Sequence, residues 1–224
     1  KAFEYEVIKD GTLNSNLDII NGKPLTNNEK KQREQLIKEI NEKGFDQVME
    51  EVAYTWFNRF IALRFMEVNN YLPKRVRIFT NENNEFKPQI LDEALNVEFE
   101  ELDKEIVFNL IEKNNEDELY KQLIIATCNE MGNYLPGLFS KISDYKVLLF
   151  PNNILRKDSI IGKMVNEIEV DSWLNQVEII GWMYQFYIQT PKDELIHAKK
   201  QYKSNEIGFV TQLFTPKWIV KYLV

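Results

Sequence analysis

Apolar and polar positions recur along most of the chain with the period of a helix. The strongest segment is 46–69, where Val48, Trp56, Phe60 and further apolar residues cover most of the circumference. A helix that is apolar on nearly every side is normally buried, so we expect this segment to be the central helix of the fold. Weaker patterns predict helices at 27–43, 88–95, 100–113, 116–131, 159–167, 173–188 and 190–202.

Local signals mark several helix ends. Thr26 and Glu29 have the spacing of a capping box, and Gly44 is suited to end the same helix. Asn115 is a predicted N-cap, because its side chain can accept from an unpaired backbone N–H. Thr190 followed by Pro191 predicts a helix start, since proline is favoured at the first helical position.

Two short segments have the alternation of a strand. These are 3–7 and the more basic segment 75–79. On the long helix, we expect Arg59 and Arg64 to form buried or edge ion pairs with acidic neighbours. The residues alone therefore predict a mainly α, multi-helix domain with one or two short strands.

The segment 208–224 predicts one more helix. Thr215 is a suitable N-cap and Pro216 fits the first helical position, after which apolar residues follow at helical spacing. The free N–H groups of a helix N-terminus favour an anion such as a carboxylate. Because the sequence starts with Lys1 and stops within this helix, we expect a fragment of a longer protein.

Four stretches carry a family resemblance. The run 211–220, which contains Phe214-Thr215-Pro216, resembles the Phe-Thr-Pro motif that opens the catalytic domain of amino-group DNA adenine methyltransferases. The stretches 51–73, 133–139 and 178–187 are similar to the N-terminal region of PglX-type methyltransferases of BREX phage-defence systems. The matches keep their order along the chain, which makes them more specific than the Phe-Thr-Pro motif alone.

The resemblance implies a domain plan and a cofactor. The plan is an N-terminal extension at 1–25, a helical domain at 26–206, and at 207–224 the first helix of a truncated α/β methyltransferase domain. In the intact enzyme, Phe214, Thr215 and Pro216 would line the methionine end of the S-adenosyl-L-methionine pocket. The alternative for these residues is an ordinary cap-and-core helix start.

Chemical motifs of methyl transfer are absent from this stretch. The sequence contains no Gly-x-Gly turn and no Asn-Pro-Pro-Tyr or Asp-Pro-Pro-Tyr segment. We therefore assign no catalytic residue, and we expect the fragment to be structural, DNA-positioning or partner-binding. His197 is the only histidine and Cys128 the only cysteine, so we expect no metal site, and we interpret Cys128 as a buried structural thiol.

Composition limits what the fragment can bind. The net charge is -7 and the pI is about 5.0, the opposite of the balance typical of a DNA-binding domain. The densest basic cluster is Lys74, Arg75 and Arg77, a candidate phosphate contact whose alternative is a solvated strand face. Double-stranded DNA and other defence proteins are expected partners of the intact enzyme. No apolar run is long enough for a membrane span, and a single thiol fits the cytoplasm.

Two other functions stay open from the sequence. One is a fragment of a type IIG restriction-methylation enzyme, whose nuclease would lie outside this chain. The other is a helical protein–protein interaction module.

Overall fold

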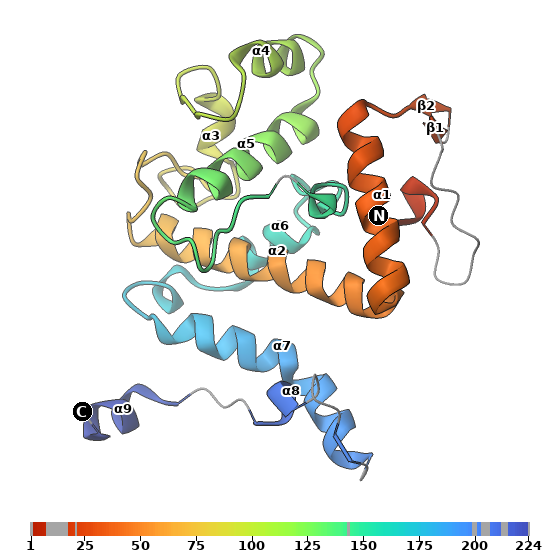
Figure 1. Cartoon of the computed structure of the whole chain (residues 1–224). Coiled ribbons are helices and arrows are strands. Elements are labelled where there is room, and N and C mark those ends of the chain that lie inside the picture. Colours follow the sequence, from red (N-terminus) through yellow and green to blue (C-terminus); the bar gives the residue numbers. More distant parts are fainter. Residues whose placement is uncertain are drawn as a thin grey trace. The chain divides into compact units, whose positions relative to one another are not determined.

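The computed structural model describes residues 2–7, 18–20, 22–142, 144–198, 201–202, 207–211 and 215–223. The chain forms two compact units, Lys1–Ile168 and Glu169–Val224. Helices dominate both units (Figure 1), which confirms the prediction of a mainly α fold with short strands. The domain plan derived from the resemblance stays a prediction.

The first unit is built from six α-helices and shorter elements among its described residues. The 3-10 helices are η1 (Ala2–Tyr5) and η2 (Tyr145–Val147), and the strands β1 (Ile19–Ile20) and β2 (Lys23–Pro24) form one antiparallel pair. The helices are α1 (Asn27–Lys43), α2 (Phe45–Val68), α3 (Gln89–Asp92), α4 (Lys104–Glu112), α5 (Glu116–Met131) and α6 (Ile160–Glu167).

Caps that can be read from the sequence set the bounds of α1. Thr26 Oγ1 accepts from the amide of Glu29, while the Glu29 carboxylate accepts from the amide of Thr26 at 2.9 Å, so the predicted capping box is confirmed. Gly44 follows the helix with φ of +92°, a conformation that residues with a Cβ rarely adopt. The chain therefore turns sharply between α1 and α2 at this glycine (Figure 1).

The core of the first unit is organised around α2, as predicted. Phe150 meets Trp56 edge-on with ring centroids 4.6 Å apart, and Phe60 makes edge contacts with Phe150 and Phe79. The indole N–H of Trp56 donates to the carbonyl of Lys146 at 3.2 Å. These contacts join α2 to segments some 20 and 90 residues further along the chain.

Both predicted strands are wrong. Residues 2–5 form the 3-10 helix η1, and residues 75–79 are irregular. Side chains take the place of a partner strand here, because the amides of Ile78 and Phe79 donate to the carboxylate of Glu67. The observed strand pair, β1 with β2, lies elsewhere and has two residues on each side.

The second unit contains η3 (Val170–Ser172), α7 (Glu178–His197), α8 (Ile207–Thr211) and α9 (Lys217–Leu223). The predicted break at Thr190-Pro191 is wrong, because α7 continues through both residues. Proline removes one N–H from the helix ladder and clashes with one carbonyl, which kinks a helix without having to end it. Figure 1 shows the later part of α7 turning away from its first part. α8 was not among the predicted helices, and it contacts α7.

Candidate functional site

The segment predicted to touch the cofactor precedes α9. Phe214 lies outside the described residues, Thr215 is exposed and Pro216 is half-buried. The carbonyl of Pro216 accepts from the amides of Ile219 and Val220 at 3.0 and 3.2 Å. The predicted helix is therefore present, but it begins at Lys217, one residue later than expected, and Pro216 occupies the cap position.

A carboxylate of the chain itself binds the start of α9. Oε1 of Glu178, the first residue of α7, accepts from the backbone N–H of Lys217 at 2.6 Å. This contact agrees with the expectation that the N–H groups of a helix N-terminus favour an anion such as a carboxylate. Glu178 thus occupies the anion position at the start of α9 in this chain, and the cofactor role of Phe214, Thr215 and Pro216 stays a prediction for the intact enzyme.

The three basic residues proposed for DNA contact have different surroundings. Lys74 pairs with Glu130 at 2.7 Å, and its ammonium lies 4.9 Å from the ring centroid of Phe99. Arg77 donates to Thr80 and Asn84 at 3.2 and 2.7 Å. Arg75 is exposed, with φ of +54°. Arg75 is therefore the member of the cluster best placed to meet a phosphate.

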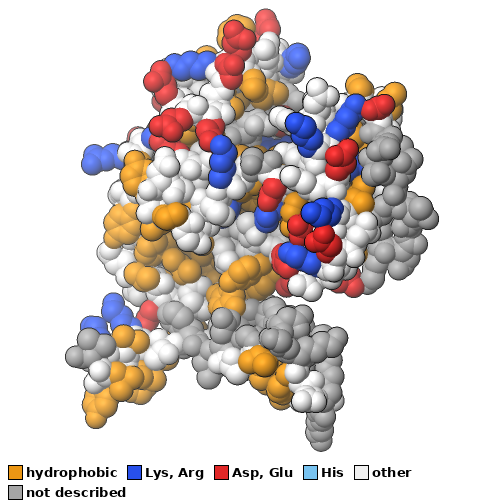
Figure 2. Space-filling view, in the orientation of Figure 1, with side chains coloured by type: hydrophobic (Ala, Val, Ile, Leu, Met, Phe, Trp, Pro, Cys, Tyr) orange, Lys and Arg blue, Asp and Glu red, His pale blue; other side chains and the backbone are white. Residues whose placement is uncertain are grey.

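Surface charge on the visible face does not form a basic patch. Figure 2 shows Lys and Arg side chains interspersed with Asp and Glu, many of them in contact. Such a surface has no strong positive field to attract a polyanion. This distribution agrees with the acidic composition.

A buried polar cluster lies at the end of α2. The carboxylate of Glu67 accepts from the guanidinium of Arg64 at 2.6 Å, from the amides of Ile78 and Phe79 at 2.5 and 2.7 Å, and from the hydroxyl of Thr80 at 2.8 Å. Arg64 and Glu67 have fully buried side chains, so the pair is shielded from water. The prediction of an ion pair for Arg64 is confirmed.

Tyr120 of α5 completes this cluster from the other side. Its hydroxyl donates to the carbonyl of Ile78 at 2.9 Å. Burial, and secondarily the negative charge of Glu67, raises the pKa of Tyr120 well above its usual value. The tyrosine is therefore a neutral donor that fixes one chain segment, which is a structural role.

Arg59 is buried, and no carboxylate among the described residues forms an ion pair with it. Its Nη2 donates to the carbonyl of Ser140 at 2.5 Å, and its guanidinium lies 5.9 Å from the ring centroid of Trp56. Nε and Nη1 have no hydrogen-bond partner in the described part of the chain. Burial lowers the pKa of this arginine. Over the described residues, the ion pair predicted for Arg59 is therefore wrong, and the backbone carbonyl of Ser140 takes the place of a carboxylate.

The single cysteine and histidine have the surroundings of structural residues. Cys128 is fully buried, and burial raises the pKa of its thiol to about 12, so the interpretation as a buried structural thiol is confirmed. His197 is exposed at the end of α7, with Nδ1 2.6 Å from the carbonyl of Asp193. Over the described ranges, no three His, Cys, Asp or Glu residues are grouped so that they could hold a metal ion.

A groove of about 710 Å³ lies between α1 and α5. One wall is a single face of α1, and the opposite wall is a single face of α5. Residues near η2 and before α4 complete the lining, and the volume is within the range of ligand pockets. The α1 wall consists of Asn28, Glu29, Lys31, Gln32 and Gln35.

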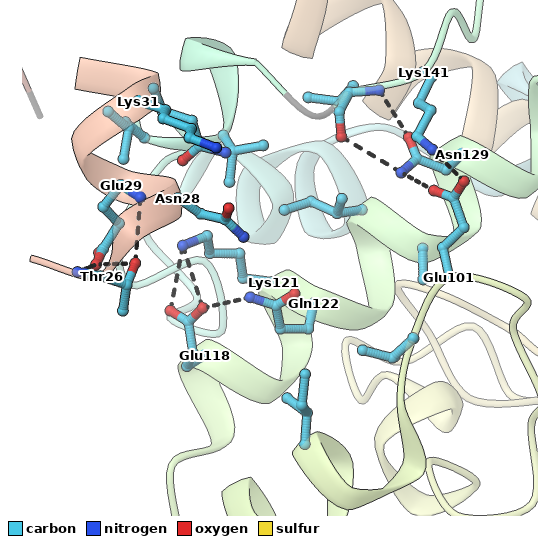
Figure 3. A pocket seen from close by; sticks show the side chains of 18 of the residues that line it. Thr26, Asn28, Glu29, Lys31, Glu101, Glu118, Lys121, Gln122, Asn129 and Lys141 are labelled. Atoms are coloured by element: carbon cyan, nitrogen blue, oxygen red, sulfur yellow. Dashed lines mark hydrogen bonds and ion pairs between the residues drawn. The ribbon is translucent and has the colours of Figure 1, made fainter. Parts of the chain in front are cut away.

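Two networks of charged and amide side chains stand at the ends of this groove (Figure 3). In one, Glu118 accepts from Lys121 and Gln122 of its own helix. In the other, Glu101 accepts from Lys141 at 2.5 Å and from Asn129 at 3.0 Å. The second network connects three separate segments and so holds one end of the groove in shape.

This groove was not predicted from the sequence. The polar residues of 27–43 that line the groove recur with the same helical spacing as those facing water. The spacing of Asn28, Lys31 and Gln35 shows that they share a face. It does not show that a second helix lies opposite.

Comparison with known proteins identifies relatives. The chain is 39% identical over 195 residues to the adenine-specific methyltransferase BrxX of Escherichia coli O9:H4 (strain HS), an alignment that covers 86% of the chain. It is 43% identical over 190 residues to the adenine-specific methyltransferase PglX of Lacticaseibacillus casei (strain Zhang), which covers 79% of the chain. The chain is a homologue of a segment of these methyltransferases. No family model matches it.

The similarity extends over a small share of each relative. The aligned stretch is 16% of BrxX and 16% of PglX. The resemblance to PglX-type proteins is thus confirmed, whereas activity, substrate and partners of the whole protein remain to be proposed. In the described part of the chain, no helix has the length and apolar character needed to cross a membrane.

Proposed function

We propose that the chain is a non-catalytic helical part of an S-adenosylmethionine-dependent DNA adenine-N6 methyltransferase that acts in phage defence. The identities of 39% and 43% to two adenine-specific methyltransferases support the family. The lack of a Gly-x-Gly turn and of an Asn-Pro-Pro-Tyr segment supports a non-catalytic role. In this proposal the intact enzyme binds cofactor and double-stranded DNA in the cytoplasm, and this segment supports the catalytic domain.

The main argument for this proposal is the exposed apolar surface of the second unit. Of the exposed large apolar side chains among the described residues, half belong to Glu169–Val224, which is a quarter of the chain. Among its described residues, only Trp173 belongs to the buried apolar set. A stretch with so much exposed apolar area and so little interior of its own is typical of an interface.

The exposed apolar side chains concentrate on α7 and α9. Trp218 is 71% exposed, Tyr222 86% and Leu223 74% on α9, and Phe186 is 75% exposed on α7. Burying one side chain of this size stabilises a protein by about 1.5–3 kcal/mol. Covering two of them would therefore contribute about 3–6 kcal/mol to docking. We propose that the catalytic domain of the intact enzyme covers them.

The test compares two double variants of the full-length protein. Trp218→Ser with Tyr222→Ser removes part of the proposed interface. Phe108→Ser with Ile160→Ser is the control, since these residues of the first unit are 56% and 57% exposed. We expect the first pair to lower the melting temperature and adenine methylation of the intact enzyme, and the control pair to leave both unchanged. Equal effects of the two pairs would contradict the proposal.

The same experiment separates docking from folding. The 224-residue chain with the Trp218 and Tyr222 substitutions is expected to keep its helical circular dichroism, because both side chains are exposed. Detectable methyl transfer to adenine by the unmodified 224-residue chain would show that the assignment as a non-catalytic part is wrong.

A further inference from the structure

The loop that follows α5 has an exposed and uncharged tip. Residues 133–138 are all exposed, and among them Tyr134 is 59% exposed, Leu135 44% and Leu138 37%. Positions 131–140 contain no charged residue, although 28% of the chain is charged. Charged side chains are found mostly at the surface of a protein. A surface segment that lacks them and exposes three large apolar side chains is typical of an interaction site.

Hydrogen bonds hold this loop in one conformation. The amides of Tyr134 and Leu135 donate to the carbonyl of Met131 at 3.0 and 2.8 Å. The amide of Phe139 donates to the carbonyl of Leu135 at 2.9 Å. Met131 and Phe139, at the two ends of the loop, are 1% and 0% exposed and so anchor it in the core. A loop that is fixed before binding loses little conformational entropy when it docks.

A further exposed aromatic side chain belongs to the same region. Tyr71 follows α2 and is 55% exposed, and positions 68–73 contain no charged residue. Lys74 and Glu130, which come directly after and directly before the two uncharged segments, bind each other at 2.7 Å. The uncharged end of α2 and the uncharged loop therefore lie close together.

The composition of the tip favours a protein surface as its occupant. The tip has no Lys or Arg to meet a phosphate, whereas tyrosine is enriched and charge is depleted at the centre of protein interfaces. A specific interface between free proteins buries about 1,200–2,000 Å², of which a few side chains cover only a part. A tethered domain docks at an effective concentration of about a millimolar, so a smaller contact is sufficient. A domain of the same polypeptide thus fits best.

We propose that the tip of this loop, residues 133–138, docks on the catalytic domain of the intact enzyme. The inference rests on the proposed function, in which this chain is a segment of a longer methyltransferase. The aligned stretch is 16% of each of the two relatives, so most of such a polypeptide lies outside this chain. The proposal extends the docking surface from α7 and α9 of the second unit to the first unit.

Photo-crosslinking in the full-length enzyme identifies the occupant. p-Benzoylphenylalanine replaces Tyr134, and cross-linked peptides are identified by mass spectrometry after irradiation. We expect cross-links from position 134 to the catalytic domain of the same polypeptide. The control is the same replacement of Phe108, which is 56% exposed but has Lys104 and Glu112 one turn away on either side. No cross-link at position 134, equal yields at the two positions, or cross-links between isotopically labelled and unlabelled copies would overturn the inference.

Two further measurements separate this inference from the proposed function and from folding. The photoreactive residue in place of Trp218 reports on α9: cross-links there without cross-links at position 134 leave the proposed function intact and overturn the inference, and none at either position overturns both. Tyr134→Ser with Leu138→Ser should lower the melting temperature of the full-length enzyme and leave that of the 224-residue chain unchanged, because both side chains are exposed. Equal losses in the two proteins would show a folding role instead of docking.

Discussion

The guanidinium of Arg64 lies 2.6 Å from the carboxylate of Glu67, three residues later on α2, with both side chains fully buried. The second oxygen of Glu67 accepts from the amides of Ile78 and Phe79. One carboxylate thus balances a buried cation and holds the segment that follows α2. This relationship, rather than a strand, determines the path of the chain after the central helix.

Removing the charge of Glu67 should destabilise the protein strongly. In Glu67→Gln, Arg64 would be left as a buried cation without a counterion, and breaking such a pair costs about 3–5 kcal/mol. The control is Glu130→Gln, which makes the same chemical change in the partly exposed pair with Lys74 and should cost less than about 1 kcal/mol. Urea unfolding monitored by circular dichroism measures both, and similar losses would contradict the role given to Glu67.

Arg59 should be replaceable by an apolar residue. Its side chain is 2% exposed, and two of its nitrogens have no partner in the described part of the chain. Exchanging buried charged groups for apolar residues of similar volume is often neutral or stabilising. We expect Arg59→Met to change the free energy of unfolding by less than about 1 kcal/mol, despite loss of the bond to Ser140. A loss of several kcal/mol in urea unfolding would show that the cation has a partner in solution.

Gly132 and Gly137, which follow α5, differ in how closely other backbone atoms approach them, and substitutions at the two positions test this difference. A Cβ on Gly132 would lie 2.5 Å from the carbonyl oxygen of Phe139 and 2.9 Å from that of Asn129. A Cβ on Gly137 would meet nothing within 4 Å. We expect Gly132→Ala to cost about 1–3 kcal/mol because the backbone must shift. Gly137→Ala should be neutral or stabilise by up to about 1 kcal/mol, since it lowers the entropy of the unfolded chain. The melting temperatures of the two variants should therefore shift in opposite directions, or by clearly different amounts, relative to the parent.

The free energy of unfolding should fall in alkaline solution. The first contribution to this loss should come from the thiol of Cys128, which ionises more readily in the unfolded chain. Its thiol has a pKa of about 12 in the folded chain and an ordinary value near 9. A group whose pKa is raised on folding contributes stability that is complete below the unfolded pKa and is lost as the pH rises toward the folded pKa. The loss for one such group approaches about 1.4 kcal/mol per pH unit above pH 9.

Cys128→Val isolates this effect. Below pH 9 we expect the variant to differ little from the parent, because valine keeps an apolar side chain at a buried position. Between pH 9 and pH 10 the parent should lose stability while the variant does not, and above pH 10 both should decline as Tyr120 begins to ionise in the unfolded chain. Urea unfolding at half-unit pH steps measures the slopes. Parallel slopes for parent and variant would show that Cys128 does not titrate on unfolding.

Local signals predicted the helix ends well. The capping box of Thr26 and Glu29, the N-cap Asn115 and the glycine after α1 all occupy their expected positions. These features depend on residues within a few positions of each other, so the sequence contains them directly. The continuation of α7 through Pro191 shows the limit of such signals, since a proline permits a helix start without requiring one.

The candidate sites were predicted less well because they depend on distant residues. Phe214, Thr215 and Pro216 were selected by resemblance, and the carboxylate bound at the start of α9 comes from Glu178, 39 positions earlier than Lys217. Lys74 and Arg77 were grouped by proximity in sequence, yet each is held by a different partner. No local pattern distinguishes a side chain that faces another helix from one that faces water.

The sequence by itself determined that the chain is helical, where α1 and α2 begin and end, and which family of methyltransferases it resembles. Tertiary structure decided the partners of the buried charges, the irregular path of 75–79 and the groove between α1 and α5. The physical reason is the distance along the chain over which each interaction acts. Helix periodicity and caps act over one or two turns, whereas Glu67 can accept the amides of Ile78 and Phe79 only once burial has brought the end of α2 and the following segment together.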